Sequence, residues 1–262
     1  SKTTSMGLAI ASVAKGDANA VVSAGNSGAL LAMSIFGLRK LSGISRPALA
    51  AVMPTISGEV VALDLGANID CSSQNLIDFS VMGIVFAQNV LGRPKPRVAF
   101  LNVGEEDNKG NSIIQEASRV MKESHFADFY KGYVEGDKVI SGNFDVVVCD
   151  GFSGNVMLKT AEGTAKLCSE YLKQVFSSSI LGKISYAIGK SSFLGIRKKM
   201  DPRKHNGAVL LGLNGIVVKS HGGTDSIGFA HAVDLATEMS VGNYNELIKN
   251  ELDKLKPVVD KK

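Results

Sequence analysis

The residues best suited to chemistry lie late in the chain, where Lys219, Ser220 and His221 are followed by two glycines. The preceding run at 215–218 is short, β-branched and flanked by glycine, which predicts a fully buried parallel strand. Open α/β sheets bind ligands beyond the carboxyl ends of such strands. A lysine and a histidine there could neutralise an anion and move a proton. Two structural alternatives stay open, a solvated Lys219 and a His221 that only caps the next helix.

A first glycine loop follows a predicted strand at 20–23 and opens a helix that contains Leu30. Free N–H groups and the helix dipole favour an anion at such a point, so we expect Asn26, Ser27 and Gly28 to hold phosphate. The alternative is an ordinary N-cap at Asn26 or Ser27. The loop lacks the third glycine of a dinucleotide fingerprint and the lysine of a P-loop.

A second glycine loop follows the predicted strand at 144–149. It resembles a nucleophile elbow around Ser153, but Asn155 stands where that motif needs glycine. A helix N-terminus that binds an anion through Gly154 and Asn155 is the better interpretation, with Lys159 one turn later on the same face. Cys149 is expected to be a buried core residue.

Polar groups also crowd the end of a predicted strand at 60–65, which leads into Asp64 and Asn68. A carboxylate there could orient a histidine or lysine, or it could form an Asx-turn cap on the next helix. The following segment at 76–91 is apolar on nearly every face, which predicts a buried helix covered by another subunit.

Alternating short apolar runs and helical patterns predict an α/β fold, with helices on both sides of a mostly parallel sheet. The 262 residues, 45% of them hydrophobic, fit a single domain over 1–262. A net charge of +4 is too weak for a dedicated nucleic-acid binder. Three cysteines without CxxC spacing indicate a reducing cytoplasm and exclude a disulfide framework. We expect no metal and no organic cofactor, because no ligand cluster or fingerprint is present.

The alternation of short apolar runs and glycine loops stops over about 164–200, which predicts a helical hairpin inserted in the domain. Serines at 177–179 and 191–192 are expected to break it, leaving a short helix over 180–188 with an apolar side and basic flanks. Such a helix suits a membrane surface. The alternative is that its apolar face packs on a partner subunit.

Four segments together, SAGNSGALLAM, LDLGANID, CDGFSGNVMLKTAEG and NGAVLLGLNGIVVKSHG, resemble the phosphate acyltransferase (PlsX) family of bacterial phospholipid synthesis in order and spacing. The resemblance covers essentially the whole chain. It implies a dimeric α/β/α sandwich like those of phosphotransacetylases and isopropylmalate dehydrogenases. It also implies that family members carry several tens of further residues before the segment that matches Ser1, including a Gly-Gly-Asp loop.

The resemblance implies transfer of a fatty acyl group from acyl carrier protein to inorganic phosphate, giving acyl phosphate for a membrane-bound acyltransferase. It therefore implies a cytoplasmic, peripherally membrane-associated homodimer. Under this hypothesis His221 and Lys219 polarise the carbonyl or shuttle the proton, Asp64 and Asn68 orient them, and the remaining polar residues hold phosphate. That last set is Asn26, Ser27, Gly28, Gly154, Asn155, Lys159 and Asn206.

Three other functions stay open. A short-chain phosphotransacylase using coenzyme A would share the anion loops. A non-catalytic scaffold could recruit lipid-synthesis enzymes to the membrane. A serine hydrolase would use Ser153 with His221.

Overall fold

The computed structural model describes residues 3–199 and 201–254, without the side chains at 192–194, 196–199 and 202. Eight strands of this part form one sheet: β1 (Ala20–Ser23), β2 (Ala48–Thr55), β3 (Gly58–Leu63), β4 (Val98–Leu101), β5 (Tyr130–Val134), β6 (Val146–Val148), β7 (Ala208–Leu211) and β8 (Ile216–Lys219). Their order is β1-β8-β7-β2-β3-β6-β4-β5.

The same part contains eight α-helices: α1 (Ser5–Lys15), α2 (Ser27–Leu38), α3 (Ser73–Asn89), α4 (Ser112–Glu123), α5 (Gly151–Ser177), α6 (Ile180–Lys199), α7 (Ser226–Val241) and α8 (Tyr244–Asp253). Two short 3-10 helices are also present. η1 (Val139–Ser141) lies between β5 and β6, and η2 (Pro202–His205) lies between α6 and β7. These counts apply to the residues described above. The α/β class and the mostly parallel sheet expected from the sequence are confirmed, since four of the seven neighbouring strand pairs in this part are parallel.

Two groups of helices cover opposite faces of the sheet. One apolar cluster joins α3, α4, α7 and α8 to the first face. On the second face, α1 and α2 cover β1, β7 and β8, while α5 covers the β2, β3 and β6 region. Side chains alternate between faces along each strand, so Ala48 and Ala50 of β2 join the first cluster whereas Leu49 joins the clusters of the second face.

Helix α3 is buried, as its apolar sequence predicts, but the expected cover by another subunit is wrong. The chain covers this helix itself, because α4 and α8 pack against α3. The Tyr244 hydroxyl of α8 donates a hydrogen bond to the Met82 carbonyl at 2.7 Å, and its ring meets Phe86 edge-on. Burial of this helix therefore carries no information about a dimer.

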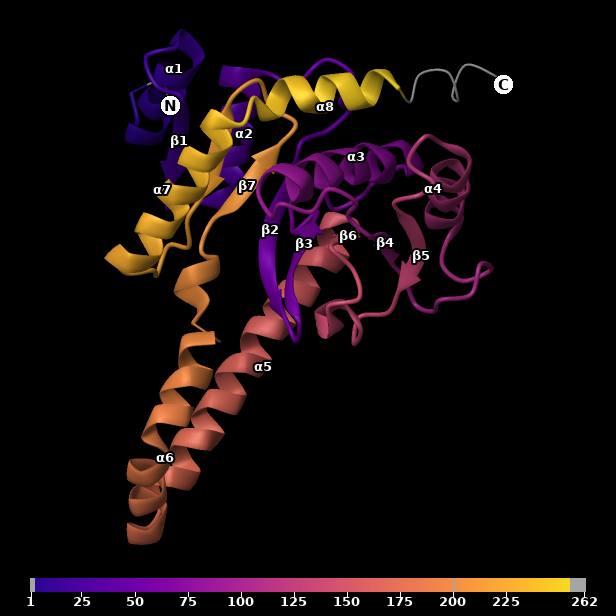
Figure 1. Cartoon of the computed structure of the whole chain (residues 1–262). Helices are drawn as coiled ribbons and strands as arrows, with labels where there is room; N and C mark the ends of the chain where they lie inside the picture. The colour runs from indigo at the N-terminus through magenta and orange to yellow at the C-terminus, as the bar shows by residue number, and fades with distance from the viewer. Residues whose placement is uncertain (1–2, 200, 255–262) are drawn as a thin grey trace.

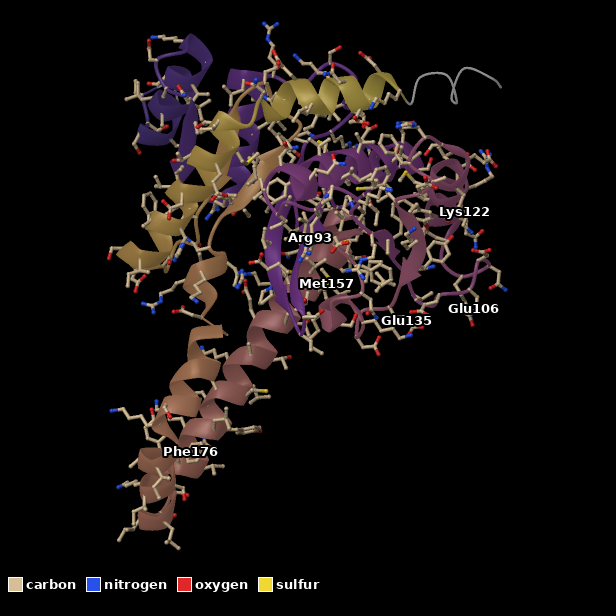
Figure 2. The ribbon with its side chains drawn as sticks, viewed as in Figure 1. Arg93, Glu106, Lys122, Glu135, Met157 and Phe176 are labelled. Carbon is tan, nitrogen blue, oxygen red and sulfur yellow. The ribbon has the colours of Figure 1, made fainter. Side chains whose placement is uncertain are left out.

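Helices α5 and α6 form a hairpin that leaves the sheet and extends far from it (Figure 1). Figure 2 shows Met157 beside the sheet and Phe176 near the far end, where the ring of Phe176 lies 5.7 Å from that of Tyr186. The predicted break at 177–179 is confirmed, since α5 ends at Ser177 and α6 begins at Ile180. The predicted break at 191–192 is wrong, because α6 runs on through these serines.

Candidate active site

Antiparallel strands in the middle of the sheet place the predicted site residues at opposite ends of the strands. The two sides of the sheet that these strand ends form are called its two edges below. β2 runs antiparallel to both β3 and β7, and β7 runs antiparallel to β8. β8 and β1 therefore point opposite to β3 and β6. The carboxyl ends of β1 and β8 carry Asn26, Lys219 and His221, while those of β3 and β6 carry Asp64 and Gly154 at the other edge.

The β1 and β8 edge brings the first glycine loop against the lysine and histidine segment. The two strands pair in parallel with Ser23 opposite Lys219, and the Ser220 amide donates to the Ser23 carbonyl at 2.9 Å. A Cβ atom on Gly222 would lie 3.4 Å from the Ala24 carbonyl oxygen, so the two loops pass closely. The first glycine loop therefore lies beside the loop that carries Lys219 and His221.

Asn26 caps helix α2, as the structural alternative for this loop required. Its Oδ1 accepts the Ala29 amide at 3.0 Å. The amides of Ser27 and Gly28 have no hydrogen bond to an acceptor within the described part of the chain, and both residues are exposed. Capping and anion binding are thus compatible here, because two N–H groups and the Asn26 Nδ2 group stay available at the positive end of the helix.

Lys219 lies close enough to Lys159 of α5 for the two charges to interact. Partial burial, and then repulsion from Lys159, lower the pKa of the Lys219 ammonium. Within the chain, Lys159 pairs with Glu162 at 2.8 Å on the surface, and the Lys219 Nζ donates to the Ser220 carbonyl. Exposed ion pairs contribute little free energy, so an anion between the two lysines can compete with Glu162. Although α5 begins at the opposite edge, its length carries Lys159 toward Lys219.

The side chain of Asn206, which precedes β7, fixes the loop that carries His221. Its Nδ2 donates to Ser220 Oγ at 2.9 Å and to the Gly228 carbonyl at 2.7 Å. Its Oδ1 accepts the His221 amide at 2.9 Å. Since its donors and its acceptor are engaged inside the protein, the geometry does not support the predicted contact of Asn206 with phosphate and indicates a positioning role.

His221 itself is exposed, and its ring orientation is set locally. Nδ1 accepts the Gly223 amide at 3.1 Å, so the neutral imidazole carries its proton on Nε2. Gly223, the second of the two glycines that follow His221, makes this contact, which holds the ring in place. The Nε2–H group of this exposed residue can donate to an oxyanion or to a leaving group.

Ion pairs of Arg203 beside the His221 loop were not predicted from the sequence. Arg203 of η2 binds Asp201 at 2.7 Å and Asp225 at 3.0 Å, and Asp225 also caps α7 by accepting the Gly228 amide. The Arg203 guanidinium lowers the pKa of Asp201 from its usual value of 3.8 to about 2. The spacing of Asp201 and Arg203 before a second aspartate was visible in the sequence, but nothing there showed that Asp225 folds back onto them.

Asp64 and Asn68 organise the opposite edge. The buried Asp64 carboxylate accepts the Leu49 amide, three amides of its own loop and the Asn68 Nδ2 group. Burial raises its pKa while these donors oppose the shift. The Asn68 Nδ2 group also reaches the Pro47 carbonyl at 2.8 Å. These partners do not support the expectation that the pair orients Lys219 or His221, because all of them belong to the loop itself or to the start of β2.

The N-terminus of α5 packs tightly on this loop. A Cβ atom on Gly154 would lie 1.9 Å from the Asp64 carbonyl oxygen, so the position requires glycine for packing. The Gly151 amide donates to Asn68, and the amides of Ser153 and Gly154 donate to Asp150. Since these donors are engaged, phosphate contact by the Gly154 amide is not supported. The Asn155 side chain is exposed and lies over Gly66.

The serine hydrolase alternative finds no support in this geometry. Ser153 Oγ donates to Asp150 Oδ2 at 2.9 Å, and His221 lies at the other edge of the sheet. Cys71 and Cys149 line a cavity of about 280 Å³ near Ser153. Burial raises the pKa of Cys71 to about 11 and that of Cys149 well above its usual range, so neither thiol suits nucleophilic attack.

Comparison with solved structures places the chain in the phosphotransacetylase fold. A phosphotransacetylase from Streptococcus pyogenes superposes with a TM-score of 0.57 over 88% of this chain and 66% of its own, at 18% identity. A branched-chain phosphotransacylase from Enterococcus faecalis gives a TM-score of 0.56 over 89% of this chain and 78% of its own, at 15% identity. At these identities the likeness concerns the fold alone.

Sequence comparison gives much closer relatives. A phosphate acyltransferase of Paramagnetospirillum magneticum is 53% identical over 97% of this chain and 72% of its own length. One of Rhodospirillum centenum is 51% identical over 99% of this chain and 73% of its own. The model of the fatty acid synthesis protein family matches residues 1–247. The chain therefore belongs to this family, the PlsX family of phosphate acyltransferases, and is an acyltransferase.

Proposed function

We propose that the protein transfers a fatty acyl group from the thioester of acyl carrier protein to inorganic phosphate. The observation that supports this most is the cationic site beyond β1 and β8, where Lys219 interacts with Lys159 and the paired strand β1 leads into the open amides of Ser27 and Gly28. Two cations and two amides suit a dianionic phosphate. The exposed His221 stands on the adjoining loop.

No covalent enzyme intermediate is needed for this reaction. A phosphate oxygen attacks the thioester carbonyl, a carbon–oxygen bond forms, and the carbon–sulfur bond breaks with the electron pair leaving on sulfur. Lys219 and Lys159 hold phosphate, and the His221 Nε2–H group stabilises the oxyanion or protonates the departing thiolate. Phosphate is already anionic near neutral pH, so positioning and electrostatic stabilisation account for most of the catalysis.

The direct test is acyl-phosphate formation from acyl carrier protein thioester and phosphate. Equal amounts of palmitoyl thioesters of carrier protein and of coenzyme A, with acetyl coenzyme A as a third substrate, distinguish the candidates. We expect the carrier-protein thioester to give the highest kcat/KM. Preference for acetyl coenzyme A would instead identify a short-chain phosphotransacylase, the alternative that shares this anion site.

We further propose that the protein is a cytoplasmic homodimer that meets the membrane through the α5–α6 hairpin. Ile180, Leu181, Ile184 and Ile188 of α6 are exposed, and Lys183 and Lys190 are exposed on the same helix. The side chains of Arg197, Lys198 and Lys199, which the sequence prediction also used, lie outside the described residues. No helix among the described residues is long and apolar enough to cross a bilayer. The acyl-phosphate product must reach a membrane-bound acyltransferase, which favours contact at the surface.

Charge reversal tests this membrane contact. Lys183→Glu with Lys190→Glu should weaken pelleting with anionic vesicles about tenfold or more, because each basic residue near anionic lipid contributes about 1 kcal/mol. Lys131→Glu with Lys15→Glu, on the body of the protein, is the matched control. Unchanged vesicle binding, or loss of the dimer, would assign the hairpin to a subunit interface. Vesicle binding without any phosphate-dependent turnover would favour the non-catalytic scaffold.

A further inference from the structure

The first half of the central strand β2 is incompletely covered on the face that carries α2 and α5. It is the fourth of eight strands, a position where side chains are normally buried on both faces. On the first face Ala48 and Ala50 are fully buried. On the second face Leu49 and Ala51 are only partly buried.

Leu49 lies at the border between two apolar clusters. It packs against the cluster under α1 and α2, which contains Leu210, and against the cluster under α5, which contains Ala62. Leu210 and Ala62 on the flanking strands are buried, 4% and 0% exposed. The helices on either side therefore cover the neighbouring strands and leave an apolar seam, formed by Leu49, Ala51 and Ala208, partly open.

The apolar seam is continuous with the cationic site. Ala51 pairs with Ala208, and Ala208 pairs with Lys219, so the three residues form one row across β2, β7 and β8. Alternation places Lys219 on the same face as the buried Val217. Because neighbouring strands are about 4.8 Å apart, Ala51 lies about 10 Å along this row from Lys219.

We propose that the apolar seam binds the part of the fatty acyl chain next to the thioester, with the reacting carbonyl at Lys219. This inference rests on the proposed function. An acyl thioester joins a reacting polar end to a flexible apolar tail. The row leads in the same order from the charged Lys219 through Ala208 to the apolar Ala51, and Leu49 lies on the same face of β2. The anion site and the seam thereby bind the two reactants side by side.

Substrate length is the readout that tests the seam. Ala51→Leu fills part of the seam, so kcat/KM should fall about tenfold or more for palmitoyl carrier protein and less than threefold for butyryl carrier protein. One methylene in an apolar site changes discrimination by about 10- to 200-fold, which sets this scale. Leu49→Ala removes contact area and should also lower the palmitoyl to butyryl ratio. Ala230→Leu on the exposed side of α7 is the matched control and should leave the ratio unchanged.

The outcomes separate this inference from the proposed function. No acyl phosphate from either substrate with the unmodified protein would remove the proposed function itself. An active protein whose palmitoyl to butyryl ratio stays within twofold in both variants would overturn the seam alone. If thermal unfolding shows that Ala51→Leu does not fold, the ratio in Leu49→Ala decides. A ratio that is unchanged while the variants alter the oligomeric state would assign the seam to a contact between copies and overturn the inference.

Discussion

Replacing Asn206 by alanine should reduce turnover through His221, although Asn206 need not touch substrate. The change removes three hydrogen bonds of 2.7–2.9 Å, which hold Ser220 Oγ, the His221 amide and the Gly228 carbonyl. At a net contribution of about 1 kcal/mol each, the free energy of unfolding should fall by about 2–3 kcal/mol. A displacement of the His221 loop by about 1 Å can lower kcat about 100-fold.

A double-mutant cycle distinguishes this positioning role from a general loss of stability. His221→Ala alone should lower kcat by about two to four powers of ten if the imidazole acts as acid or base, and a drop below tenfold would make it structural. Once His221 is absent, Asn206→Ala should cost less than about threefold, because the group that it positions is gone. The assay is initial-rate acyl-phosphate formation at a temperature where every variant is folded. Equal losses from Asn206→Ala with and without His221 would show that Asn206 does not act through His221.

Three further perturbations follow from the same contacts. Gly154→Ala should lower the free energy of unfolding by about 3 kcal/mol or more in urea titration, because its Cβ would lie 1.9 Å from the Asp64 carbonyl oxygen. The matched control Gly163→Ala should not lower it, since no atom lies within 4 Å of the added Cβ there. Lys159→Met should shift the alkaline rise of KM for phosphate to higher pH, because burial and, secondly, repulsion from Lys159 lower the pKa of Lys219, and the change removes the repulsion; an unmoved profile would mean that Lys219 does not bind phosphate. Because the folded pKa of Asp201, about 2, lies below its usual 3.8, the Asp201–Arg203 pair stabilises the fold above about pH 4 and loses this effect as pH falls toward 2. Arg203→Met should therefore flatten the dependence of unfolding free energy on pH in that window.

Individual helices and strands were predictable where a clear hydrophobic pattern was bounded by capping residues or glycines. The strand at Ala20–Ser23 has the predicted bounds, since a glycine loop ends it. Serines at 191–192 misled the prediction for α6, because serine weakens an exposed helix without ending it.

Strand direction was not predictable, and it decides which site residues meet. An apolar run such as Ala208–Leu211 has the same sequence pattern whether it lies parallel or antiparallel to its neighbours. The antiparallel β2 and β7 therefore separate Asp64 from His221, although both follow strands. The approach of Lys159 to Lys219 likewise depends on the path of α5 across the sheet, which the spacing of these residues does not encode.

The most direct test of acyl transfer to phosphate is phosphate-dependent thiol release from palmitoyl carrier protein, measured together with acyl phosphate in the same samples. Acyl transfer to phosphate predicts one acyl phosphate for each thiol released, no release without phosphate, and a KM for phosphate that rises about tenfold or more in Lys219→Met, as expected for loss of a charged contact. Thiol release without phosphate, or an unchanged KM for phosphate in Lys219→Met, would contradict it.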